Sequence, residues 1–154
     1  MNTYAAMLFL HVIAVVVWVG GMFLMHFAVR PACVALLDAP QRLPLLTEIL
    51  RRFFHWVTIA VVSVLLTGWV IIVVGGGFRV AHPSVRLMSG VGLVMIAIFA
   101  HIRLAPFKRL LAAVAARDWP AGARSLDQIR KEVAFNLVLG VATIAIATLG
   151  RVIL

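Results

Sequence analysis

The sequence predicts an all-α membrane protein built as a bundle of four transmembrane helices. Apolar residues make up 64% of the 154 residues, a share well above that of water-soluble domains. The first 29 residues contain no Asp, Glu, Lys or Arg. At about 1.5 Å per helical residue, this run is long enough to cross a hydrocarbon core of about 30 Å. Three further apolar runs follow, and the chain shows no alternation of the membrane β-barrel kind.

The expected spans cover residues 3–29, 53–74, 85–105 and 133–154, within one domain, 1–154. The first run lacks a basic n-region and a small-residue cleavage site, so we expect a retained span and not a signal peptide. It ends near Arg30-Pro31. The second span ends at the glycine turn 75–77. The third is short, so Arg86 and Arg103 at its ends are expected to snorkel.

The two long connections are also predicted to be helical. Residues 43–53 repeat apolar positions at helical spacing, which fits an extension of the second span or a short interfacial helix. Residues 107–116 are expected to continue the third helix past the membrane. Asp118-Trp119-Pro120 then interrupts it, with Asp118 as an N-cap, and residues 125–132 lead into the fourth span.

Basic residues set the expected orientation and explain the net charge of +9. The connections 30–52 and 103–132 hold eleven of the fourteen Lys and Arg residues. The positive-inside rule places these connections in the cytoplasm and both termini on the other side of the membrane. The charge therefore indicates contact with the anionic lipid of the bilayer, and no nucleic-acid partner is expected. A homo-oligomer is left open.

Several side chains that bind metals gather on one face of the first span. At about 100° per residue, Met7, His11, Met22 and Met25 lie within about 60° of one another. Gly21 is near this face and lets another helix come close, while His26 stands at its edge. Ionisable groups in membrane helices usually face the bundle interior and often have a function.

The five histidines divide by their expected depth. His26, His55 and His101 lie near the cytoplasmic ends of their spans, with Asn136 at similar depth. His11 lies about 10 Å below the outer surface, where Met7, and His82 or Met88, complete an outer group.

Two chemistries fit these groups. Thioethers and imidazoles select Cu(I), and His11, Met22, Met25 and His26 form a ladder of candidate copper ligands. Haem b needs one or two axial ligands on facing helices, and the candidates are His11, His26, His55 and His101. Copper is the favoured cofactor.

A third hypothesis is a structural or assembly subunit with incidental histidines. No span contains an acidic residue, no P-loop or catalytic triad is present, and no catalytic residue is assigned.

The opening helix combines Leu10-His11 with the stretch 18–22, WVGGM, and resembles the first helix of bacterial CopD-like membrane proteins. The stretches 26–32, 42–46 and 118–120, with Asn136-Leu137 and 149–151, resemble a short four-helix branch of that family. This resemblance implies a bacterial inner-membrane location with periplasmic termini, and a link to copper. CopD proteins named for copper resistance are longer. The Leu-His pair also resembles HemJ-like haem-associated enzymes, whose later Lys-containing motif has no counterpart here.

Overall fold

The computed structural model describes residues 3–153, with side chains up to Gly150. The first helical rod, called helix 1 below, comprises α1 (Thr3–Val15), η1 (Val16–Gly20), α2 (Gly21–Leu24), η2 (Met25–Val29) and α3 (Arg30–Leu36). Two of these segments, η1 and η2, are single π-helical turns. The remaining helices are α4 (Ala39–Val74), α5 (Pro83–Leu104), α6 (Pro106–Ala115) and α7 (Trp119–Ile153). No strand occurs within residues 3–153.

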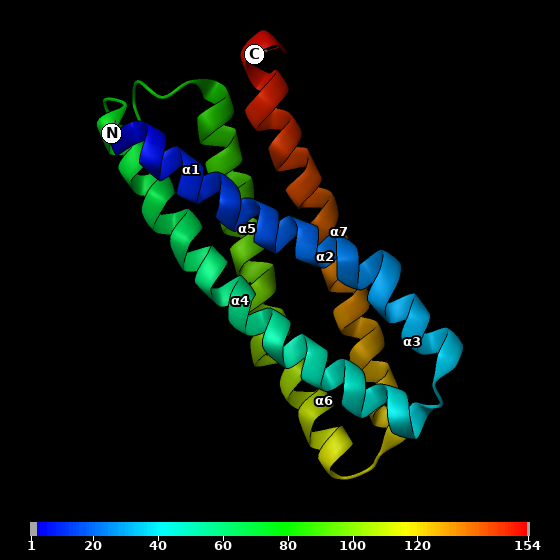
Figure 1. Cartoon of the computed structure of the whole chain (residues 1–154). Coiled ribbons are helices and arrows are strands. Elements are labelled where there is room, and N and C mark those ends of the chain that lie inside the picture. Colours follow the sequence, from blue (N-terminus) through cyan, green and yellow to red (C-terminus); the bar gives the residue numbers. More distant parts are fainter. Residues whose placement is uncertain (1–2, 154) are drawn as a thin grey trace.

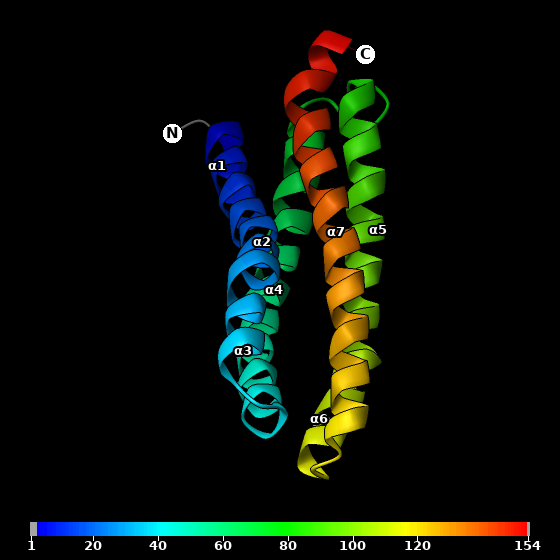
Figure 2. The same ribbon diagram turned by 90° about the vertical axis from the view of Figure 1, so that its right-hand side faces the viewer.

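The helices form two antiparallel pairs, helix 1 with α4 and α5–α6 with α7 (Figures 1 and 2). The start of α1 at Thr3 and the end of α7 at Ile153 lie at one end of the bundle, together with the connection 75–82; this is the terminal end. The connections 37–38 and 116–118 lie at the other end, which we call the basic end after its Arg and Lys residues. Buried apolar side chains of all four rods form one core, with Leu43, Ile102 and Leu110 almost fully enclosed.

The prediction of an all-α protein with four membrane-spanning helices is confirmed. The helical segments 3–36, 39–74, 83–115 and 119–150 are each long and apolar enough to cross a membrane. All are longer than the predicted spans. A helix of 36 residues such as α4 measures about 54 Å, well beyond a hydrocarbon core of about 30 Å. Part of each rod therefore extends past the apolar layer.

Helix 1 continues through Arg30-Pro31, where the sequence predicted the end of the first span. Pro31 lacks the N–H that would bond to the carbonyl of Phe27, and its ring crowds that carbonyl. The π-turn η2, Met25–Val29, lies directly before it and opens the helix at this point. The chain then stays helical to Leu36.

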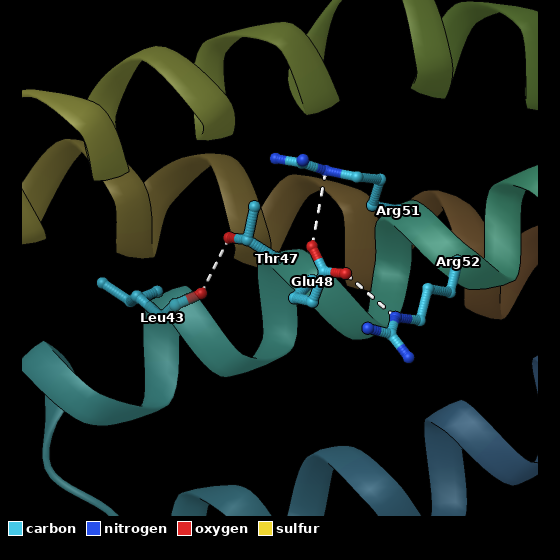
Figure 3. A network of polar contacts seen from close by, with 5 residues as sticks. All are labelled: Leu43, Thr47, Glu48, Arg51 and Arg52. Carbon is cyan, nitrogen blue, oxygen red and sulfur yellow. Dashed lines mark hydrogen bonds and ion pairs between the residues drawn. The ribbon is translucent and has the colours of Figure 1, made fainter.

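The start of α4 decides between the two alternatives for residues 43–53, because α4 is continuous from Ala39 and so extends the second span. Figure 3 shows its polar contacts. Thr47 Oγ1 donates to the carbonyl of Leu43 at 2.7 Å. Glu48 lies between Arg52 Nε, at 2.9 Å, and Arg51 Nε, at 3.6 Å. These local contacts stabilise the helix outside its apolar segment.

The predicted breaks at the glycine turn 75–77 and at Asp118 are confirmed. Asp118 caps α7, since its Oδ1 accepts a hydrogen bond from the N–H of Ala121 at 3.0 Å. The third rod bends at Ala105 and continues as α6. In the glycine turn, Gly76 and Gly77 have φ values of 97° and 93°, which side chains disfavour.

Three glycines mark where helices approach most closely. A Cβ on Gly21 would overlap the Phe53 ring of α4 at Cε2, which confirms that Gly21 lets another helix come close. A Cβ on Gly140 of α7 would lie 2.9 Å from Val19 Cγ2, and one on Gly150 would lie 2.7 Å from Ser84 Cβ. Each glycine joins a different pair of rods.

Candidate metal-binding site

His11 makes a hydrogen bond between a side chain of helix 1 and one of α4. Its Nδ1 lies 2.9 Å from Thr67 Oγ1. The ring rests over Gly68, where an added Cβ would come within 3.3 Å of His11 Cε1. Thr67 is buried and His11 is half-buried, so the contact lies inside the pair of helices.

The hydrogen bonds of Thr67 fix the role of each His11 nitrogen. The hydroxyl of Thr67 donates its single proton to the carbonyl of Ser63 at 2.6 Å. With that proton committed, we assign Thr67 Oγ1 as the acceptor and His11 Nδ1 as the donor of their contact. In the neutral ring, Nε2 then carries a free lone pair. This is the arrangement of metal-binding histidines, whose other nitrogen donates to an outer partner.

Sequence reasoning missed Thr67 and Ser63. A signal was present, since Thr67-Gly68 puts a hydroxyl beside a missing side chain within an apolar span. Thr67 also lies seven residues before the end of α4 at Val74, and His11 lies eight residues after the start of α1 at Thr3. In antiparallel helices joined at the other end, such positions lie at matching depth.

The two thioethers of the predicted ladder lie further along helix 1 and are enclosed to different degrees. Met22 is 2% exposed and belongs to the core, while Met25 is partly buried against that core. They lie in α2 and at the start of η2, with π-turns on both sides of Met22. Single π-turns inside α-helices are often found at functional sites.

His26 does not share the surroundings of His11. Together with Met25 and Arg30 it lines a small cavity where helix 1 meets α4 and α7 at the basic end. Its ring packs edge-on against Phe27, with the centroids 4.8 Å apart. Arg130 of α7 lines the same cavity.

The other histidines have separate partners. His55 is exposed on α4, with its ring 6.2 Å from that of Trp56. His101 of α5 is exposed and its Nε2 lies 3.6 Å from Glu132 Oε1 of α7. His82 caps α5 by accepting from the N–H of Ser84. Across the described chain, no three His, Cys, Asp or Glu residues are grouped so as to hold a metal, so the inner histidines form no such group.

Asn136, expected at the depth of the inner histidines, is 1% exposed in the core. Its Nδ2 donates to the carbonyl of Met95 at 3.3 Å. Its Oδ1 is buried, and no described residue donates to it. A buried amide oxygen without a donor is costly, so this group is a second polar feature of the core.

The family model described as "Copper resistance protein D" (CopD) matches residues 47–149. The match covers α4 from Thr47 onward, α5, α6 and most of α7, and it leaves helix 1 outside. No curated protein and no solved structure matches the chain. The matched segment is about two thirds of the chain and contains Thr67, the partner of His11. With its four membrane-spanning helices, the chain belongs to the CopD family and is a multi-pass membrane protein related to copper resistance.

Proposed function

We propose that this protein binds Cu(I) within the membrane along helix 1 and passes it between successive ligands, of which His11 is the first. The observation that carries the proposal is the hydrogen bond from His11 Nδ1 to Thr67 Oγ1. It leaves Nε2 free as a ligand and holds the ring in one orientation, as outer partners of metal-binding histidines do.

The ligand types suit the monovalent ion. Thioether and imidazole ligands select Cu(I) over harder cations. Met7 lies one helical turn before His11, and Met22, Met25 and His26 follow on the same rod. An ion that must also leave needs several weak sites in place of one strong one. Cys33, a free and partly buried thiol in α3, continues the series of soft ligands.

The orientation of the ladder in the membrane follows from the charge. We infer that the terminal end faces the periplasm of a bacterial inner membrane, since eleven of the fourteen Lys and Arg residues lie in the connections of the basic end. The His11 end of the ladder then lies nearer the periplasm, and His26 lies nearer the cytoplasm.

The test is a Cu(I) titration of the purified protein in mild detergent against a chromophoric Cu(I) chelator. We expect His11→Ala to weaken the affinity at least about tenfold, and Met22→Leu, which preserves the volume of the side chain, to weaken it less. His55→Ala is the control, because His55 is exposed on α4. Unchanged affinity in both His11→Ala and Met22→Leu contradicts the proposal.

An absorption spectrum of the same sample, with elemental analysis, tests the haem b alternative. We expect no Soret band and uptake of copper under reducing conditions. A strong Soret band with about one equivalent of iron would overturn the copper proposal and assign His11, His26, His55 or His101 as axial ligands instead. If the protein binds neither haem nor copper, the result favours a structural subunit.

A further inference from the structure

A second site lies at the basic end of the bundle, in the cavity beside His26. This cavity has a volume of about 30 Å³ and is open on one side. Helix 1, α4 and α7 each contribute to its wall. Most of the wall is apolar, and two arginines stand in it; the lining residues are Met25, His26, Arg30, Leu46, Leu50, Leu126, Ile129, Arg130 and Val133.

The Nε–H group of Arg30 is buried, and no described residue accepts a hydrogen bond from it. The charged groups near enough to act on Arg30 are Arg130, Asp127 and Arg42, and two of these repel it. A buried donor on a charged group without a partner costs more free energy than a neutral one.

The nearby acid does not fill this role. Asp127 Oδ1 pairs with Arg130 Nη2 at 2.7 Å, and its Oδ2 pairs with Lys131 Nζ at 2.9 Å. Arg42 directs Nη1 to the carbonyl of Leu37 at 3.2 Å and adds positive charge. The cavity therefore combines excess positive charge, an unmet N–H donor and an apolar wall.

The position along the chain indicates the kind of anion. Arg30 is the first charged residue after 29 uncharged ones, so it lies where the hydrocarbon core meets the headgroup layer. Lipid phosphates occupy this layer, and acyl chains run beside the apolar surface that continues from it. A free phosphate ion gains nothing from the apolar wall formed by Leu46, Leu50 and Val133.

We propose that this cavity binds one anionic phospholipid, whose phosphate accepts from Arg30 Nε beside the ion-paired Arg130, while an acyl chain covers the apolar wall. A volume of about 30 Å³ admits phosphate oxygens and not a whole headgroup, which stays at the open side. The guanidinium fork suits two oxygens of one phosphate. The inference does not depend on copper binding, because the phosphate is held by Arg30 and not by Met25 or His26, the two copper-path residues that also line the cavity.

The experiment measures lipid binding to the full chain by native mass spectrometry after delipidation in detergent. Phosphatidylglycerol is titrated beside phosphatidylcholine with the same acyl chains, and beside inorganic phosphate. We expect one tightly bound phosphatidylglycerol, weakened about tenfold or more in Arg30→Gln, the size expected for one charge-assisted hydrogen bond. The control Arg124→Gln removes the same charge from α7 at the same end, outside this cavity, and should change little.

Three other results of this titration would each overturn the proposal. Equal binding of phosphatidylcholine rules out recognition of negative charge. Displacement of phosphatidylglycerol by millimolar inorganic phosphate identifies a free phosphate site without a lipid chain. Equal weakening in Arg124→Gln reduces the effect to net charge. If Arg30→Gln does not fold, Arg30→Lys and Arg130→Gln carry the test, and wild-type affinity in both contradicts the site.

Discussion

Two imidazoles on the same helix lie in opposite electrostatic surroundings. His11, at the terminal end, donates to Thr67 of α4, and the segments 3–29 and 53–74 that hold the two residues contain no charged side chain. His26, fifteen positions later along helix 1, lines a cavity with Arg30 and Arg130. The first arrangement leaves a nitrogen free beside an uncharged wall. The second places an imidazole beside two cations.

The difference teaches that residue type alone does not define a metal ligand. Arg30, for which the described residues show no ion pair, repels a cation near His26, whereas the uncharged segments around His11 present no such barrier. A copper path along helix 1 is therefore expected to weaken toward the basic end. A gradient of this kind lets an ion bind and still be released.

The largest expected effect comes from replacing each of the two histidines with alanine, in separate variants. His11→Ala should lower Cu(I) affinity about a hundredfold, because loss of an outer partner alone commonly costs about 10–100-fold. His26→Ala should lower it by less than about tenfold. Chelator competition on both variants measures the gradient. An equal loss in the two would mean that the arginines do not affect copper binding.

Gly21 lies between the two imidazoles and tests whether helix 1 must pack closely on α4. Gly21→Ala places a methyl group against Phe53 and should destabilise the protein by about 1–3 kcal/mol. Gly20→Ala is the matched control, since no atom lies within 4 Å of the added group, and it should be neutral or slightly stabilising. Thermal unfolding in detergent measures both. A stable Gly21→Ala variant would show that the approach is looser than described.

Thr67→Val sharpens the comparison by removing only the hydroxyl that orients His11. We expect Cu(I) affinity to fall about tenfold, the lower limit for an outer partner. Thr148→Val removes a hydroxyl that likewise donates to its own helix, at Ile144, but faces no histidine. It should leave the affinity unchanged. If Thr67→Val also binds copper normally, the orientation of His11 does not matter.

The smallest effect is expected from the exposed ion pairs of α4 at the basic end (Figure 3). Glu48→Gln removes the pairs with Arg51 and Arg52. Exposed pairs contribute little to stability, so neither thermal unfolding nor copper affinity should change measurably. A clear change in copper affinity would extend the influence of basic-end charge beyond the cavity of His26.

The fold could be predicted well from the sequence, because the length of each apolar run and the residues that begin or end a helix depend only on neighbouring residues. The runs between charged segments, the glycine turn 75–77 and the cap at Asp118 all depend on neighbouring residues. The close approach at Gly21 was also predictable, because a glycine lies near the buried face. The beginning of α4 at Ala39 was one of two alternatives that only the three-dimensional fold decided.

The sites were harder to predict, because their partners lie far away in the sequence. Thr67 is 56 positions from His11, and which face of α4 meets helix 1 depends on packing of the whole bundle. A plot at about 100° per residue also assumes uniform α-helix, whereas η1 and η2 hold more residues per turn. The side chains after Gly20 are therefore rotated about the helix axis relative to that plot. His26 was expected at the edge of the face with Met7 and His11, and it lines a cavity with Met25.

The three glycines at the helix contacts also constrain how this sequence can diverge. Any relative that keeps the same bundle should retain glycine at positions 21, 140 and 150, because a larger residue at any of them presses on a side chain of the neighbouring rod. Positions 20, 90 and 92 have no atom within 4 Å of an added Cβ and should vary freely. The pattern of retained and replaced glycines in related sequences thus records which helices touch.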